Sequence, residues 1–276
     1  MSSTPAPAAR RADPWYADAG HALHAEWTKA RTAGGTTWLL PAVIAATVAV
    51  GGAVATATRC PAAGCGQDPA KVSLSGIDLA QAVVAIQAVL MISGEYGTGM
   101  IQVTLTAMPR RTTMLAAKAA ILTGLVMVAG TVAVLGSVLA GRLILPGHGF
   151  NPAHGYPLLS LADGTYLRAA AGSVLYLALI GLLALGIATA VRDSAAAIGA
   201  VLGLLYLFPV IAAAVSSPHW QRHLEQIAPM SAGLAIQATT GLNTLPINPW
   251  AGLGVLAAWT AGALLAGALL LRIRDA

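Results

Sequence analysis

Six long stretches of the sequence contain no aspartate, glutamate, lysine or arginine, and this pattern constrains the fold more than any other feature. An uncompensated charge at the centre of a bilayer costs at least about 2.5–3.5 kcal/mol, so a membrane-spanning helix needs such a stretch. Each stretch is long enough for a helix of about 20 residues, which crosses the hydrocarbon core. The pattern predicts an all-α integral membrane protein with six spans, at residues 36–57, 76–94, 114–140, 168–191, 195–216 and 250–271.

The composition excludes several other classes of protein. Of the 276 residues, 57% are hydrophobic and 9% are charged, whereas a soluble domain contains about 25% charged residues. An ordinary cytosolic enzyme and a disordered protein are therefore excluded. The net charge of +5 comes from scattered basic residues, so no nucleic-acid partner is expected and the lipid bilayer is the expected surroundings.

The basic residues predict the orientation of the chain. With the N-terminus inside, ten of the fifteen lysines and arginines lie on the inner side of the predicted spans. The positive-inside rule then places both termini in the cytoplasm. Because arginine far outnumbers lysine and alanine and glycine abound, the composition indicates a bacterial protein, which makes the plasma membrane the expected location.

The region before the first span divides into two parts. Residues 1–14 are rich in alanine, proline, serine and arginine and are expected to form a disordered tail, whereas residues 15–276 form a single transmembrane domain. Residues 15–33 are expected to form an amphipathic helix in the inner membrane interface, with Trp27 at headgroup depth. Its apolar stripe comprises Tyr16, Ala19, Leu23, Trp27 and Ala30. The polar residues expected to project away from this stripe are His24, Glu26, Lys29 and Arg31.

The segment between the second and third spans, residues 93–113, is the most informative part of the chain. Glu95 stands at the cytoplasmic exit of the second span, and Gly97 and Gly99 permit a sharp reversal. An apolar run follows, which Pro109 ends, and two arginines then place charge at the inner surface. The residues alone leave two interpretations open: a re-entry loop with a basic anchor, or a helix that docks on a cytoplasmic partner. The apolar residues of the run are Met100, Ile101, Val103, Leu105 and Met108.

The predicted outer side carries two cysteines and a second unusual apolar segment. Cys60 and Cys65 lie in the first outer loop, where an oxidising environment permits a disulfide, and the sequence leaves open whether they are bridged. No zinc site is expected there, because Asp68 is the only further ligand nearby. Residues 230–242 are apolar and uncharged but too short to span, which predicts an interfacial or re-entrant outer segment before the sixth span.

Motifs for catalysis and for nucleotide binding are missing from the sequence. The chain lacks the phosphate-binding pattern GxxxxGK[ST], so it is not expected to bind ATP itself. Asp78 and Lys118 stand near span ends, where their charged groups are expected to reach the interface. No metal site is predicted, but one alternative remains open, a membrane enzyme that binds a metal or haem through outer histidines. These histidines are His148, His154, His219 and His223.

The segment that begins at Glu95 resembles the membrane subunits of ABC exporters, the ABC-type-2 permeases. The shared pattern, E-x-G-T-G-x-I-x-x-T-L-T-x-x-P-R-R, ends at Arg111 and is followed by Lys118 near the start of the third span. Residues 25–32 (AEWTKART) are similar to the amphipathic elbow helix of the family. The proline–tryptophan pair at 249–250 and the final residues LRIRDA are similar to its C-terminal end.

The resemblance implies that the chain is the permease subunit of an ATP-driven exporter, without enzymatic activity of its own. Two copies of a separate ATPase would hold the ATP and magnesium, and a second permease copy would complete a homodimer. Spans two and five would line the pathway, and the elbow helix would contribute Leu23, Trp27 and Lys29. The residues implied in ATPase coupling are Glu95, Gly97, Thr98, Gly99, Met100, Ile101, Val103, Leu105, Arg110 and Arg111.

The expected cargo is lipophilic or amphipathic, such as a drug, a lipid or a peptide, because the spans are largely apolar. The sequence does not distinguish among these classes. The other alternative is a permease-like immunity or regulatory membrane protein, which would protect the cell instead of exporting a product.

Overall fold

The computed structural model describes residues 15–32, 34–60, 66–97, 111–156 and 159–274, and this part of the chain is helical without any strand. Six of its helices are long and apolar enough to cross a membrane, which confirms the predicted number of spans and indicates a multi-pass membrane protein. They are α2 (Gly34–Ala57), α4 (Ile77–Gly97), α6 (Arg111–Ile144), α7 (Gly164–Val191), α8 (Ser194–Ala214) and α11 (Pro249–Arg274).

The third of these helices is longer than the sequence predicts. Helix α6 has 34 residues, which corresponds to a length of roughly 50 Å. The hydrocarbon core of a bilayer is only about 30 Å thick. Helix α6 must therefore tilt or extend beyond the core, and its first turns provide a site of attachment for other elements.

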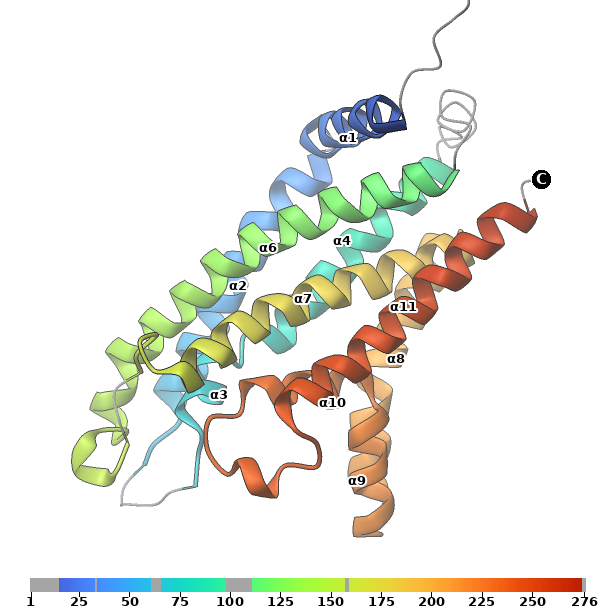
Figure 1. The fold of residues 1–276 in the computed structure, drawn as a ribbon. Coiled ribbons are helices and arrows are strands. Elements are labelled where there is room, and N and C mark those ends of the chain that lie inside the picture. The colour runs from blue at the N-terminus through green and yellow to red at the C-terminus, as the bar shows by residue number, and fades with distance from the viewer. Residues whose placement is uncertain (1–14, 33, 61–65, 98–110, 157–158, 275–276) are drawn as a thin grey trace, which may run out of the picture.

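Short helices cover the two ends of the bundle. Helix α1 (Trp15–Thr32) lies across one end, where the C-terminal end of α11 is also found (Figure 1). We call this the α1 end. The opposite end, the α9 end, carries α3 (Pro69–Leu74), α9 (Pro218–Ile227) and α10 (Pro229–Leu234). The 3-10 helices are η1 (Leu145–His148), η2 (Pro152–His154), η3 (Ala235–Gln237) and η4 (Leu242–Thr244).

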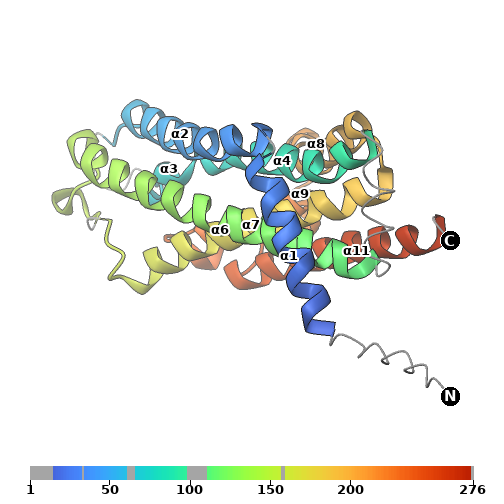
Figure 2. The same ribbon diagram turned by 90° about the horizontal axis from the view of Figure 1, so that it is seen from above.

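Helix α7 forms the centre of the bundle. It packs against α4, α6, α8 and α11, and Figure 2 shows it near the middle of the molecule. The most apolar stretch of α7 is 67% buried, against 22% for those of α2, α8 and α11. Helices α2, α8 and α11 therefore keep most of their apolar surface available for lipid or for another protein.

Helices α7 and α11 cross closely through small residues. A Cβ atom added at Gly186 would lie only 2.6 Å from the carbonyl carbon of Ala263. The two backbones are therefore in direct contact. Membrane helices use this form of packing because lipid supplies no hydrophobic driving force for their association, so that close van der Waals contact through small residues takes its place. Helix α7 ends at Val191, and the residue that caps it, Arg192, has a left-handed φ of 65°. Asp193 then caps the start of α8, where its side chain accepts from the main-chain N–H of Ala196.

A short helical segment before α11 is buried at the α9 end. Most residues from Ala228 to Ala238 are buried, and α10 and η3 pack against α7 and α11. Close approach is again made possible by glycine, because a Cβ atom at Gly252 would lie 2.0 Å from the carbonyl oxygen of Ala232. The apolar segment predicted at residues 230–242 thus begins as part of the protein interior, and its end, from Gly241 on, is exposed.

Candidate functional site

Helix α1 attaches to the bundle through a face that contains small residues and one acid. Ala22, Glu26 and Ala30, spaced four residues apart, are all buried. Leu23 and Trp27 remain 38% and 40% exposed. The prediction that Glu26 projects with the polar face is therefore wrong. The physical reason is that alanines at either side bring the α1 backbone close, and that Glu26 finds a cation within the bundle.

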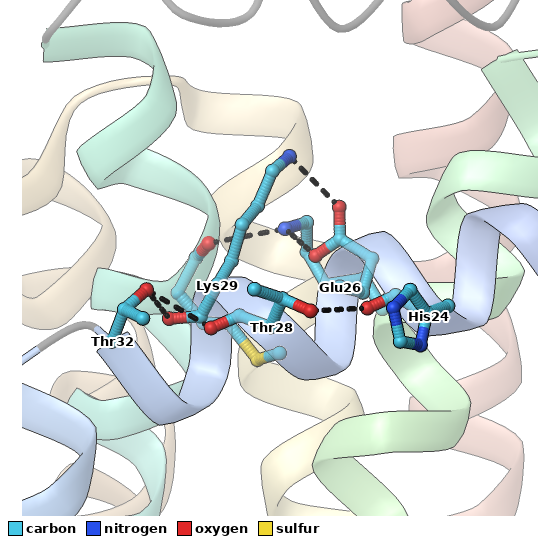
Figure 3. A network of polar contacts seen from close by, with 7 residues as sticks. His24, Glu26, Thr28, Lys29 and Thr32 are labelled. Atoms are coloured by element: carbon cyan, nitrogen blue, oxygen red, sulfur yellow. Dashed lines mark hydrogen bonds and ion pairs between the residues drawn. The ribbon is translucent and has the colours of Figure 1, made fainter.

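The buried Glu26 carboxylate lies between two lysines. The Nζ atom of Lys118 on α6 is 2.6 Å from Glu26 Oε2, and both side chains are almost completely buried. Lys29 Nζ, which is partly exposed, lies 3.1 Å from Glu26 Oε1. Figure 3 shows the Lys29 ammonium facing the Glu26 carboxylate from the same helix. Each carboxylate oxygen thus accepts from a charged donor, and the contact with Lys118 is the shorter of the two.

Lys118 also connects α1 to α4. Its ammonium group donates to the main-chain carbonyl oxygen of Met91 at 3.3 Å. The prediction that Lys118 reaches the membrane interface is wrong, because the side chain is only 1% exposed and points to Glu26. We call Glu26, Lys118, Lys29 and the Met91 carbonyl the inter-helix clamp, since these groups join α1, α4 and α6.

The inter-helix clamp lies close to the segment that the resemblance assigns to ATPase coupling. Met91 is six residues before the end of α4, and Lys118 is seven residues after the start of α6, so each is about two helical turns from that segment. Gly97, the last residue of α4, and Arg111, the first of α6, mark its ends, and Glu95 belongs to the last turn of α4. The remaining predicted coupling residues lie outside the described residues: Thr98, Gly99, Met100, Ile101, Val103, Leu105 and Arg110.

The exposed threonine hydroxyls of α1 donate to main-chain carbonyl oxygens of the same helix. The hydroxyl of Thr28 donates to the carbonyl oxygen of His24, and that of Thr32 donates to the carbonyl oxygen of Thr28, both at 2.9 Å (Figure 3). The Arg31 guanidinium lies 5.7 Å from the centre of the Trp27 ring, within cation–π range. The outward face of α1 therefore combines exposed apolar and aromatic groups with few unmet polar groups, as a helix at a lipid interface requires.

A neutral hydrogen-bond network joins α4, α7 and α8 nearer the α9 end. The hydroxyl of Tyr176 donates to Gln81 Oε1, and Gln81 Nε2 donates to the hydroxyl of Tyr206 at 3.2 Å. Tyr206 in turn donates to the main-chain carbonyl oxygen of Asp78 at 2.6 Å. Sequence reasoning missed this network, because a glutamine and two tyrosines on three helices have no recognisable spacing.

Asp68 holds the α9 end together with neutral donors. Its Oδ1 atom accepts from the main-chain N–H of Ala70 at 3.0 Å and from the hydroxyl of Thr239 at 2.6 Å. Its Oδ2 atom accepts from the main-chain N–H groups of Thr239 and Thr240, at 2.5 Å and 3.0 Å. We call this set of contacts the Asp68 junction. It fixes the chain that follows η3 to the start of α3.

The connection between α2 and α3, predicted to be the first outer loop, contains a disulfide-bonded cysteine. Cys60 is disulfide-bonded and buried. Cys65, the other cysteine of the sequence, lies outside the described residues. The main-chain N–H of Cys60 donates to the carbonyl oxygen of His148 at 2.8 Å, so the loop is also held to the connection between α6 and α7.

The four histidines predicted on the outer side divide into two separate pairs. His148 and His154 use their Nδ1 atoms on main-chain carbonyl oxygens of their own connection. His219 and His223 lie together on α9, with their Nε2 atoms 3.2 Å apart. Within the ranges that the structure describes, no group of three or more histidine, cysteine, aspartate or glutamate side chains is placed to hold a metal ion. A metal or haem site at these histidines therefore stays a hypothesis from the sequence.

Comparison of the sequence with models of known protein families and with curated proteins finds no match.

Proposed function

We propose that this chain is the permease subunit of an ATP-driven ABC exporter in the bacterial plasma membrane. In this proposal two copies of the chain form the translocation pathway, and each copy binds a separate ATPase that holds ATP and magnesium. The observation that carries the proposal is the inter-helix clamp, which joins α1 to both helices that flank the predicted coupling segment.

The inter-helix clamp suits the transmission of force from a partner. If an ATPase moves the segment between α4 and α6, both helices must move together for the motion to reach the pathway. A buried charge pair resists separation, because parting it removes a close contact between opposite charges in an apolar environment. The Glu26–Lys118 pair therefore favours a rigid-body movement of α1, α4 and α6.

Helix α1 has the properties of the elbow helix in this proposal. The α1 end then faces the cytoplasm, and α1 lies in the inner interface with Leu23 and Trp27 toward lipid. Lys29 contributes to the inter-helix clamp and keeps part of its surface exposed at the same time. A helix anchored in this way limits how far α4 and α6 can tilt relative to the membrane plane.

Helices α4 and α8, the second and fifth spans, are proposed to line the pathway and to face the second copy. They pack against each other, and α8 exposes large apolar side chains such as Leu207 and Val210. Gly199 and Gly203 of α8 have open space around them within the described chain, so a second backbone can approach there. The buried α10–η3 segment is proposed to be the re-entrant outer segment beside this pathway.

A co-purification experiment tests the proposal. The tagged chain is extracted in mild detergent, and the proteins that accompany it are identified by mass. The proposal predicts a cytoplasmic ATPase with the GxxxxGK[ST] pattern, at one copy per permease. Isolation of the chain alone, or with a partner that is not an ATPase, would contradict it.

A second experiment, which uses variants, distinguishes a transporter from an immunity or regulatory protein. Introduction of a charge at Ile101 or Leu105 should uncouple ATP hydrolysis from export without preventing membrane insertion. Unchanged export in these variants would contradict the coupling role.

A strain that lacks the gene should then be tested for hypersensitivity to a single secreted compound. Such hypersensitivity would indicate protection as the physiological role.

A further inference from the structure

A cavity of about 340 Å³ lies at the α9 end, between the α3–α4 junction, the end of α9 and the α10–α11 region. This volume is within the range of about 300–1,000 Å³ that ligand pockets occupy. Three charged side chains line the cavity, Lys71, Asp78 and Glu225. Part of its wall is apolar and includes Leu234, Leu245 and Ile247.

The two carboxylates are available to a ligand. Asp78 stands in the first turn of α4, where the helix dipole favours a negative charge. Gln221 Nε2 donates to Glu225 Oε1 at 3.3 Å, which orients that carboxylate without neutralising it. Within the described residues, neither Asp78 nor Glu225 forms an ion pair; the ion pairs found there centre on Glu26. The acids of the cavity thus outnumber its single cation, Lys71.

One wall of the cavity is held in place by the neutral hydrogen-bond network. Tyr206 on α8 donates to the main-chain carbonyl oxygen of Asp78, and Gln81 joins Tyr206 to Tyr176 on α7. The position of the Asp78 backbone is therefore set by three helices. A site whose supporting groups are fixed in this way binds with a smaller loss of conformational entropy.

We propose that this cavity binds amphipathic amines, with the ammonium group between Asp78 and Glu225 and the hydrocarbon part against Leu234, Leu245 and Ile247. An ammonium group complements the excess of negative charge, and the apolar wall excludes water from the remainder of the ligand. This inference rests on the proposed function, in which α4 and α8 line the pathway. It assigns amphipathic amines as the cargo class that meets the cavity on the outer side of the membrane.

The test uses the full chain in phosphatidylcholine nanodiscs, with empty nanodiscs as the blank, and isothermal titration as the measurement. Three probes share the phenylethyl group and carry head groups of different charge: phenethylammonium, 2-phenylethanol and 3-phenylpropionate. Phenethylammonium should bind at least about tenfold more tightly than the other two, since tenfold corresponds to 1.4 kcal/mol of favourable charge interaction. Equal binding of the cation and the alcohol would overturn the proposal.

Substitution of the acids and of the lysine in the cavity should change the affinity for phenethylammonium in opposite directions. Asp78→Asn and Glu225→Gln should each weaken phenethylammonium binding about fivefold to tenfold, whereas Lys71→Gln should strengthen it, because a like charge is removed. Asp163→Asn is the matched control, since it removes an acid outside the cavity and asparagine retains the cap of α7. Lys71→Gln also serves as a control for misfolding, because a misfolded protein would not gain affinity for phenethylammonium. Unchanged affinity in both acid variants would overturn the proposal.

The titration is independent of the ATPase, so the two proposals can fail separately. If the ATPase co-purifies but phenethylammonium does not bind, the exporter proposal stands and the assignment of the cargo class is wrong. If phenethylammonium binds as expected and no ATPase accompanies the chain, the cavity is a ligand site of a different kind of membrane protein, and the cargo assignment is again overturned.

Discussion

The two ends of the bundle hold a buried acid in different ways. At the α1 end, Glu26 is paired with cations, and the Glu26–Lys118 pair is almost completely buried. At the α9 end, Asp68 accepts only from neutral groups, three main-chain N–H groups and one hydroxyl. The inter-helix clamp ties long helices to one another, whereas the Asp68 junction ties a connecting segment to a short helix.

This difference indicates how each end responds when it is disturbed. Removal of one partner of a buried ion pair is costly for the charge that stays buried, so α1 depends strongly on the Glu26–Lys118 contact. Neutral donors that lose an acceptor at the α9 end are close to exposed residues such as Thr240, and water can replace part of the loss. The α1 end is thus suited to concerted movement, and the α9 end to a fixed surface around a cavity.

The largest effect is expected from Glu26→Ala. The variant removes the carboxylate that the buried Lys118 ammonium contacts at 2.6 Å, which should lower the free energy of unfolding by about 3–5 kcal/mol. Chemical unfolding in detergent, followed by circular dichroism, measures this change. The double variant Glu26→Gln, Lys118→Met should recover much of the loss, because no charge remains buried. A single variant as stable as the wild type would show that the ion pair does not hold α1.

A smaller and more local effect is expected from Asp68→Ala. Loss of the carboxylate removes charge-assisted hydrogen bonds to Thr239, Thr240 and Ala70, with an expected cost of about 1.5–3 kcal/mol. Hydrogen exchange should increase at residues 236–242 and remain unchanged in α1. If exchange increases equally at both ends, the two ends are not independent and the comparison is wrong.

Tyr206→Phe should produce a weaker change still. The variant removes one hydroxyl from the neutral network and leaves Gln81 with fewer partners, at a cost of about 0.5–1.5 kcal/mol. Thermal unfolding measures the cost, and the titration with phenethylammonium shows whether Asp78 has moved. Retention of the wild-type melting temperature together with the wild-type affinity would mean that the network does not position the cavity wall.

The smallest effect is expected from Lys29→Gln, which is the matched control for the inter-helix clamp. Lys29 contacts the same carboxylate as Lys118 but is 31% exposed, and a partly solvated pair contributes only about 0–1 kcal/mol. The same unfolding assay should place this variant close to the wild type. A loss as large as that of Glu26→Ala would assign the main role to Lys29 instead of Lys118.

The sequence predicts the helical architecture well because each span carries its own signal. A charge-free apolar stretch is a local property, and it identifies six helices without reference to any other part of the chain. The presence of a helix from Trp15 to Thr32 is likewise readable from its spacing. Which face of this helix is buried cannot be read from the spacing, because Lys118, which contacts Glu26, lies 92 residues away on another helix.

The remaining contacts of both ends depend on such long-range pairs. Asp68 meets Thr239 across 171 residues, and Tyr176 meets Gln81 across 95. Nothing in the local pattern near Asp68 distinguishes an acceptor of main-chain hydrogen bonds from a metal ligand or a solvated acid. The sequence therefore predicts which residues are polar within apolar surroundings, and only the three-dimensional arrangement shows which of them meet.

We propose that an ATPase docks at the α1 end, between α4 and α6. Photo-crosslinking in living cells tests this docking, with the reactive amino acid at Ile101 and, as the control position, at Leu242 near the α9 end. The Ile101 variant should be crosslinked to a protein with the GxxxxGK[ST] pattern, and the Leu242 variant should not. Absence of an ATPase crosslink from Ile101, or a crosslink from Leu242 instead, would contradict it.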